Sequence, residues 1–211
     1  MVSPVTALAT ADWRRNVFAL YEQARRASES ISVSHAHSLW ATGRDRLFGT
    51  HPASPLPEAT RRRFRGLRTA RYDPAFRFEA VIEDAGAGQS MEVATGTDGV
   101  VPFTRLGTVS VDGVGSLAVW NLDSYGGGIF IPVKDATSGA DGGSYGGGRY
   151  LLDTIKGANL GAGERPGSLV LDFNYLYNPS CAYDEAWACP LPGPENTVDA
   201  GLPVGELYAR Y

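Results

Sequence analysis

The first fifty residues have the hydrophobic spacing of two amphipathic helices. Over residues 11–27 apolar residues recur every three or four positions, and Asp12 stands where a helix N-cap is expected. Residues 34–48 repeat the pattern, and the side predicted to be buried consists of Leu39, Trp40, Leu47 and Phe48. Three closely spaced prolines then exclude a regular helix. A short third helix is expected to begin at Pro57 and to end at Gly66.

From residue 76 onward the hydrophobic period changes to two, which predicts β-strands. Residues 76–83 alternate between apolar and polar side chains. Six further strand-like stretches follow, near 90–95, 100–111, 116–122, 128–134, 148–152 and 168–174. Because no helical stretch separates these segments, the strands are expected to pair antiparallel. The predicted fold class is therefore α+β, with N-terminal helices packed on a mainly antiparallel β-barrel or sandwich.

The chain is expected to form a single domain over residues 1–211, made of a helical part (1–75) and a glycine-rich β part (76–211). The two parts carry opposite charge. Up to residue 77, 13 basic residues stand against 6 acidic ones, and from residue 78 onward 6 basic residues stand against 17 acidic ones. Opposite charges favour packing of the two parts on each other. The tail from Pro190, rich in proline and glycine, is expected to wrap irregularly over the surface.

Composition excludes several classes of protein. No apolar run reaches the roughly 18 residues that a membrane span needs, and the first residues lack the charged start and apolar core of a signal peptide. A cytoplasmic protein without membrane association is therefore expected. The net charge of −4 argues against a nucleic-acid partner. The oligomeric state, a homodimer included, stays open.

A dense polar motif covers the end of the predicted strand 128–134 and the glycine-rich stretch after it. Lys134 and Asp135 close the strand, and Tyr145 precedes three glycines that lead into Arg149. Consecutive glycines let a ligand approach the backbone, and an arginine beside them can hold a carboxylate or phosphate through two parallel hydrogen bonds. The alternative is a glycine-rich hairpin in which Arg149 only pairs with an aspartate.

A second polar motif follows the apolar strand near 168–174. Asp172 and Asn174 lie on the same side of this strand, and Tyr177, Asn178 and Cys181 follow in a loop. Polar residues concentrated where a buried strand ends are typical of a pocket rim. The alternative is that Asp172 and Asn174 only bond the backbone of the next loop.

The cysteines and histidines do not predict a metal site. Cys181 and Cys189 are eight residues apart, which is wider than a zinc pair requires. Packed thiols, a disulfide, and a metal-bound or reactive thiol all stay open. Among the histidines only His51, in a loop held by prolines, is a candidate for a site.

Taken together, these motifs resemble the domain of unknown function 1684 (DUF1684) family of bacterial and archaeal proteins. The segments that carry the resemblance are 54–56, 64–67, 130–139, 145–151, 171–174, 177–179, 181–183, 189–192 and 195–196. The resemblance extends from about residue 12 to the end of the chain. In one departure, Tyr175-Leu176 stands where Arg-Ala is usual, which removes a positive charge beside the predicted site. The resemblance implies a shared pocket and brings no established reaction.

Two functions are predicted for that pocket. The first is an enzyme that acts on a small anionic metabolite at the barrel mouth by cofactor-independent acid–base chemistry, as a lyase, isomerase or hydrolase. Carboxylates near a lysine and an arginine can be tuned to opposite protonation states, which such chemistry needs. The predicted catalytic residues are Asp172, Asp135 and Tyr145, and the predicted substrate-binding residues are Lys134, Arg149, Asn174, Tyr177, Asn178, Cys181 and His51. The second function is a non-catalytic β-barrel that binds a small ligand in the same pocket.

Overall fold

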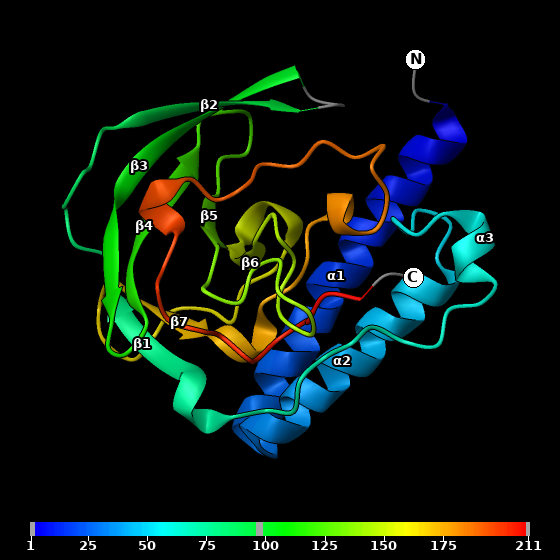
Figure 1. Cartoon of the computed structure of the whole chain (residues 1–211), viewed down its shortest axis with the longest axis horizontal. Helices are drawn as coiled ribbons and strands as arrows, with labels where there is room; N and C mark the ends of the chain where they lie inside the picture. Colours follow the sequence, from blue (N-terminus) through cyan, green and yellow to red (C-terminus); the bar gives the residue numbers. More distant parts are fainter. Residues whose placement is uncertain (1–2, 96–98, 210–211) are drawn as a thin grey trace.

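A computed structural model describes residues 3–95 and 99–209, in which a helical hairpin packs against a strongly curved antiparallel sheet (Figure 1). The hairpin consists of α1 (Pro4–Ser30) and α2 (Val33–Thr50), followed by a short α3 (Glu58–Arg61). Helix α1 is longer than its apolar repeat predicts, because the Ser3 side chain accepts the amide N–H of Thr6 and caps a helix that starts with proline. The prediction that Asp12 is the N-cap is therefore wrong, and α3 also ends well before Gly66.

Seven strands follow the helices, close to the positions that the sequence predicts. They are β1 (Arg77–Val81), β2 (Ser90–Thr95), β3 (Gly99–Val111), β4 (Gly115–Leu122), β5 (Ile129–Val133), β6 (Arg149–Asp153) and β7 (Ser168–Asp172). Every pairing among them is antiparallel. The 3₁₀ turns are η1 (Pro74–Phe76), η2 (Thr154–Lys156), η3 (Phe173–Tyr175), η4 (Ser180–Ala182) and η5 (Pro194–Asn196). The α+β class is confirmed.

The described strands do not close into a barrel. Five of them form one sheet in the order β2-β3-β4-β5-β6, and β1 pairs with β7 in a separate two-stranded sheet. Strands β6 and β2 are the two edges of this sheet and do not pair, and Tyr150 at the free edge of β6 exchanges backbone hydrogen bonds with Tyr177 in the loop after β7. The finer prediction of a barrel or sandwich is not confirmed. A single bridge between Glu83 and Thr108 connects the small sheet to the large one.

Two apolar cores meet at the segment that follows β7. The main core lies between the curved sheet and the β1–β7 pair, and Leu171, Phe173 and Leu176 belong to it. A second core joins α1 and α2 to the rest of the fold, and Tyr175 belongs to that one. Neighbouring residues of one short segment therefore belong to different cores and anchor the helices and the sheets to each other.

The C-terminal tail packs against the interior with alternate side chains buried. In Figure 1 it crosses inside the curve of the sheet to η5 and returns beneath it. Leu202 is fully buried, and Val204 and Glu206 are nearly so. The side chain of Asn196 accepts the indole N–H of Trp120 and donates to the carbonyl of Ala118. The tail is irregular, as expected, and it lies only partly on the surface, because exposed residues alternate with buried ones between Asn196 and Val204.

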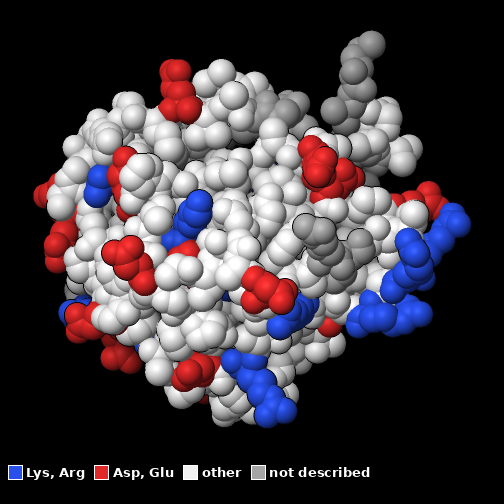
Figure 2. All heavy atoms as spheres, in the orientation of Figure 1, with Lys and Arg blue, Asp and Glu red and all other residues white. Residues whose placement is uncertain are grey.

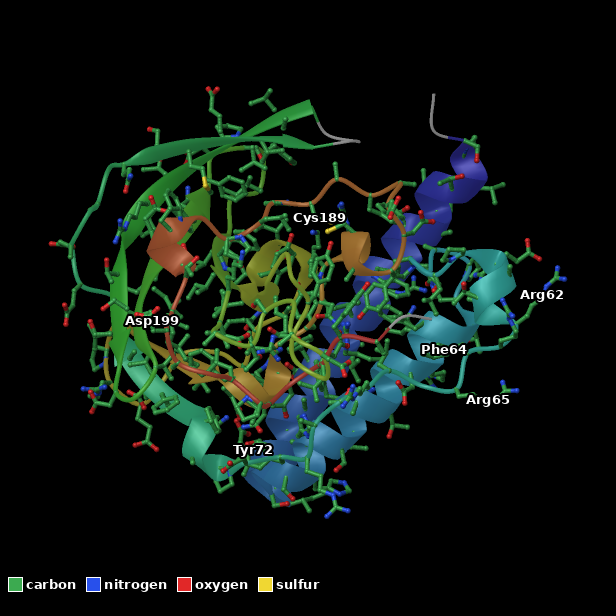
Figure 3. All side chains as sticks on the ribbon, in the orientation of Figure 1. Arg62, Phe64, Arg65, Tyr72, Cys189 and Asp199 are labelled. Atoms are coloured by element: carbon green, nitrogen blue, oxygen red, sulfur yellow. The ribbon has the colours of Figure 1, made fainter. Side chains whose placement is uncertain are left out.

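The charge asymmetry of the sequence is visible on the surface. Basic side chains gather at the edge of the molecule that α3 occupies, and acidic ones are spread over the face in front of the sheet (Figure 2). Arg62 and Arg65 project outward there (Figure 3), and Arg62 pairs with Glu58 on its own helix. None of the described helices combines the length and the apolar character that a membrane span requires.

Candidate functional site

Arg149, the predicted anion-binding residue, is enclosed by the protein. Its guanidinium bonds to the carboxylate of Asp135 at 2.9 Å and to the carbonyls of Leu202, Val204 and Glu206 in the tail. The Arg149 side chain is 1% exposed and the Asp135 side chain 0%. The structure therefore uses this arginine to hold the tail in the interior, and no ligand reaches it in this conformation.

The Asp135 carboxylate is also surrounded by protein donors. Its carboxylate accepts the hydroxyls of Ser144, at 2.7 Å, and Thr137, at 2.5 Å. Burial alone raises the pKa of Asp135, but the charge of Arg149 and these hydroxyl donors outweigh it and hold the pKa below its usual value. The glycines before Arg149 also serve packing: a Cβ on Gly148 would meet Pro192 of the tail at 2.5 Å.

Lys134 and Tyr145 lie at the edge of this cluster. The backbone of Lys134 bonds to Asn196 and Val198 of the tail, and its side chain is half-buried. The Tyr145 hydroxyl donates to the carbonyl of Cys181 at 3.4 Å and contacts the Cys181 sulfur at 3.9 Å. Burial and the neighbouring Cys181 raise the pKa of Tyr145 to about 12.

Asp172 forms a second centre, at the end of β7. One carboxylate oxygen accepts the Tyr72 hydroxyl at 3.2 Å and the Arg77 guanidinium at 3.1 Å. The other accepts the backbone and side-chain N–H groups of Asn174, at 3.1 and 2.8 Å. Asn174 also exchanges two hydrogen bonds with the backbone of Asp73. Both Asp172 and Asn174 are thus used to fix the chain around them.

The remaining predicted residues lie in other surroundings. Tyr177 donates to Asp153 at 3.3 Å and covers the Arg44 guanidinium, whose carbon lies 4.9 Å from its ring centre. Asn178 donates its backbone N–H to Glu206. His51 lies among the helices and contacts Asp12 at 3.0 Å. The Asp135 and Asp172 centres share no hydrogen bond or ion pair in the described part of the chain, so the predicted site residues do not converge on one cavity.

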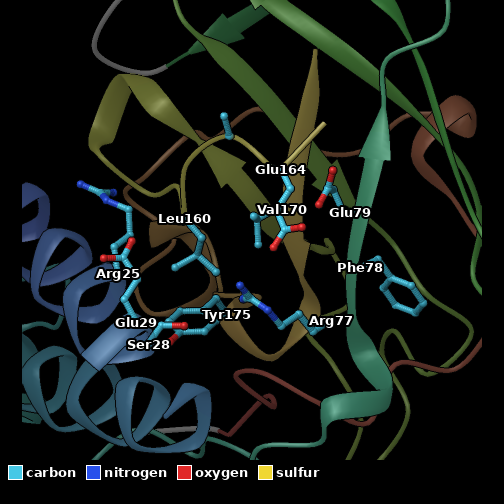
Figure 4. Close-up of a pocket in the computed structure, with 12 residues that line it drawn as sticks. Arg25, Ser28, Glu29, Arg77, Phe78, Glu79, Leu160, Glu164, Val170 and Tyr175 are labelled. Atoms are coloured by element: carbon cyan, nitrogen blue, oxygen red, sulfur yellow. The ribbon is translucent and has the colours of Figure 1, made fainter. Parts of the chain in front are cut away.

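A pocket of about 450 Å³ opens next to Asp172, between α1, β1 and the turn that precedes β7 (Figure 4). Its lining consists of Arg25, Ser28, Glu29, Arg77, Phe78, Glu79, Leu160, Ala162, Gly163, Glu164, Val170 and Tyr175. None of these residues was among the predicted site residues. Arg77 and Tyr175 project into the middle of the pocket, and acidic side chains lie at both ends.

Two groups at the centre of this pocket have unused hydrogen-bonding capacity. The Arg77 side chain is 33% exposed, and Asp172 is the only residue to which it donates in the described part of the chain. The Tyr175 hydroxyl has no hydrogen-bond partner among the described residues. Burial, followed by the charge of Asp172, raises the pKa of Tyr175, so this hydroxyl keeps its proton. The pocket therefore offers a fixed cation and a neutral hydroxyl side by side.

The other charged side chains of the pocket differ in whether they form hydrogen bonds. Arg25 bonds to Glu22 and to the carbonyl of Asn159. Glu79 accepts Ser168 and Arg165, and hydrogen bonds led by the one from Ser168 lower the pKa of Glu79 to about 2. The carboxylates of Glu29 and Glu164 accept no hydrogen bond from the described residues. They are the free negative charges at the pocket rim.

A second depression, of about 480 Å³, also borders the Asp172 centre. Its lining includes His37 and Tyr72, the latter bonded directly to Asp172. His37 bonds to the carbonyl of Asn174 at 3.0 Å, and burial lowers the pKa of His37. Among the described residues, no group of three or more histidine, cysteine, aspartate and glutamate side chains is placed to hold a metal ion.

With this geometry in place, comparison with known proteins defines the family. Residues 62–207 match the family model described as "Protein of unknown function (DUF1684)". The chain belongs to the DUF1684 family. It is similar to a solved structure of an uncharacterized protein from gene locus rrnAC0354 of Haloarcula marismortui, determined by solution NMR. The two are 30% identical, the match covers 85% of this chain and 96% of that chain, and the TM-score is 0.57. No curated protein matches the sequence.

The DUF1684 match covers only part of the pocket lining. It includes β1, β7 and Tyr175, which provide the central groups, and it excludes α1, which provides Arg25 and Glu29. The signal for Arg77 in the sequence was its polar position in a strand that alternates apolar and polar residues. That signal identifies a solvent-facing side chain, but it does not show that Arg77 lies opposite Asp172 in the β1–β7 register.

Proposed function

We propose that this DUF1684 protein binds a small molecule in the pocket between α1 and the β1–β7 pair, and that Arg77 holds an anionic group of that molecule. The observation that carries the proposal is the partly exposed Arg77 guanidinium, whose orientation is set from behind by a fully buried aspartate. The sequence predicted non-catalytic ligand binding at Arg149, and the present proposal assigns that function to Arg77. The pocket also lies within the size range of small-ligand sites.

Asp172 favours binding because it pre-organises the arginine. One N–H of Arg77 is directed at Asp172, which restricts the planar guanidinium before a ligand arrives. A side chain that is already ordered loses less conformational entropy on binding. Its other N–H groups remain available for a carboxylate or phosphate, and the Tyr175 hydroxyl can donate one more hydrogen bond to the same oxygen atoms.

The acidic rim restricts the ligand further. Glu29 and Glu164 lie at the two ends of the pocket, and their carboxylates form no hydrogen bond or ion pair with the described residues. A compact dianion would be repelled by them, whereas a zwitterion can place its anionic group at Arg77 and its cationic group at a glutamate. The ligand class that this charge pattern favours is a small zwitterion such as an amino acid.

Acid–base catalysis is the second candidate, and the free Tyr175 hydroxyl beside Arg77 is the observation that favours it. These two groups could stabilise a developing negative charge on a bound substrate. Asp172 is a weaker candidate for the base, because its side chain has no exposed surface and both of its oxygens accept hydrogen bonds. The cofactor-independent lyase, isomerase or hydrolase thus depends on Tyr175 and would be recognised by turnover that Tyr175→Phe abolishes.

The binding proposal can be tested by NMR titration. Uniformly ¹⁵N-labelled protein would be titrated with glutamate, succinate and inorganic phosphate. We expect saturable shifts at Arg77, Tyr175 and residues 160–164, with glutamate binding more tightly than the two other probes. The Arg77→Met variant should lose these shifts, and the matched variant Arg63→Met, at an exposed site away from the pocket, should keep them. No saturable shift with any probe, or shifts that persist in Arg77→Met, would contradict the proposal.

A further inference from the structure

The two cysteines are brought together by the loop that joins η4 to the tail. Cys181 lies in η4, which begins directly after Pro179, and Cys189 directly precedes Pro190. Both are free thiols and both are half-buried. They are near enough that each affects the protonation of the other. Figure 3 shows the sulfur of Cys189 beside η4. The eight-residue separation, too wide for a zinc pair, is bridged by this loop, which brings the two thiols near each other.

Both ends of this loop are anchored to the glycine-rich segment and β6. The hydroxyl of Tyr150 donates to the carbonyl of Pro190 at 2.6 Å, and Tyr150 itself is 2% exposed. The hydroxyl of Tyr145 bonds to the carbonyl of Cys181. Of the residues between the cysteines, 182–184 are half-buried and 185–188, Trp187 among them, are exposed. The loop that carries the two thiols is therefore held at both ends and exposed between them.

The two thiols have different surroundings. Around Cys189 lie the thiol of Cys181 and the backbone N–H groups of Cys181 and Ser180. The Lys156 ammonium adds a positive charge nearby. These contacts, the Cys181 hydrogen bond first, lower the pKa of Cys189, whereas the pKa of Cys181 is raised by the same hydrogen bond and by burial.

We propose that Cys181 and Cys189 form a thiol–disulfide exchange site for small-molecule disulfides, in which Cys189 is the attacking thiolate and Cys181 the resolving thiol. In the first step the Cys189 thiolate attacks one sulfur of the disulfide, the S–S bond breaks, and one small thiolate leaves. In the second step Cys181 loses its proton to water and attacks the Cys189 sulfur, which expels the second small thiolate. The protein dithiol is oxidised by two electrons to a disulfide, and the small disulfide is reduced to two thiols.

The asymmetry of the pair determines the order of the two steps. A thiolate is the nucleophile in exchange reactions, and the donors around Cys189 stabilise its anion. The groups that face Cys189 are Cys181, Tyr145, Tyr150 and Lys156, and Lys156 in turn pairs with Asp153. Of these, the two tyrosines keep their protons at neutral pH, because burial raises the pKa of both. The thiol site is separate from the ligand pocket, so the two proposals stand independently.

Mass spectrometry of the full chain treated with oxidised glutathione tests the proposal. We expect the wild type to end with an internal Cys181–Cys189 disulfide and no bound glutathione. Cys181→Ser should retain one glutathione, on Cys189, because the resolving thiol is missing. Cys189→Ser should react more slowly than Cys181→Ser, because it lacks the thiol that lies beside the Lys156 ammonium and the backbone N–H groups of Ser180 and Cys181. Equal rates for the two variants, or a wild type that retains glutathione without closing the disulfide, would overturn the proposal.

A second measurement keeps the test valid if one variant folds poorly. The rate of iodoacetamide alkylation of wild-type Cys189, located by peptide mapping, should rise with pH around a midpoint below that of an ordinary thiol. Lys156→Met, an exposed change outside the pair, should move this midpoint upward without changing thermal unfolding. A midpoint at the ordinary thiol value in the wild type would also overturn the assignment.

Discussion

Two aspartate–arginine pairs in this protein have similar chemistry and opposite accessibility. In the Asp135–Arg149 pair, the two side chains are 0% and 1% exposed, and the arginine donors are directed at the aspartate and at carbonyls of the tail. In the Asp172–Arg77 pair the aspartate is equally buried, but the arginine is 33% exposed and faces a pocket. The comparison shows that an arginine paired with a buried aspartate is accessible to a ligand only where part of its guanidinium remains exposed.

The largest expected difference between the two pairs is in how much the loss of each arginine lowers the free energy of unfolding. Arg149→Met leaves Asp135 and three carbonyls without their donor in the interior, which should lower the free energy of unfolding by about 3–5 kcal/mol. Arg77→Met should cost only about 1 kcal/mol, because the arginine is partly solvated and Asp172 keeps its hydrogen bonds from Tyr72 and Asn174. Urea unfolding followed by tryptophan fluorescence measures both.

The exposed variant Arg63→Met is the control for this comparison and should stay within about 0.5 kcal/mol of the wild type. Equal losses for Arg149→Met and Arg77→Met would break the comparison, because the two pairs would then have the same structural role.

The next effect separates the pairs by ligand binding. Arg77→Lys keeps the charge but removes the planar fork, so the affinity for glutamate should fall by about tenfold. Arg149→Lys should destabilise the fold yet leave that affinity unchanged in the folded protein. Isothermal titration calorimetry, at a temperature where circular dichroism shows both variants folded, gives the two dissociation constants. If only Arg149→Lys lost binding, the anion would bind at Arg149 and the proposal for Arg77 would be contradicted.

The dependence of the free energy of unfolding on acidic pH tests the Asp135–Arg149 pair alone. Because the folded-state pKa of Asp135 lies below its unfolded value, the pair stabilises the protein above about pH 4 and loses this contribution as the pH falls further. The free energy of unfolding should therefore fall with decreasing pH in the wild type, and less steeply in Asp135→Asn. Unfolding curves at a series of acidic pH values measure the slope, and parallel slopes would show that Asp135 gains nothing from Arg149.

The smallest expected effect concerns the hydroxyl at the centre of the pocket. Tyr175→Phe removes an oxygen that has no partner among the described residues, so stability should change by less than about 0.5 kcal/mol. Glutamate affinity should fall a few-fold, by about 1 kcal/mol, if the hydroxyl donates to the ligand. Thermal unfolding and calorimetry on the same sample separate the two outcomes. A clear loss of stability would indicate that the hydroxyl has a structural partner.

Much of the secondary structure could be predicted from the sequence. The strand positions follow from the change of hydrophobic period after residue 75, and the family followed from its clustered motifs. The start of α1 was missed because the apolar repeat begins only at Trp13, while the Ser3-Pro4 cap lies outside that repeat. The pairing of Arg149 with an aspartate was one of the two alternatives that the sequence left open.

Local pattern by itself determined which residues form helices and strands, because the period of apolar positions reports which side of an element is buried. It also determined that Arg149 follows glycines and that Asp172 ends a strand. Only the tertiary structure decided which arginine faces solvent. The tail covers Arg149, the β1–β7 register places Arg77 opposite Asp172, and α1 closes the pocket around it. These are contacts between residues far apart in the chain, and the accessibility of a charge depends on them rather than on its sequence neighbours.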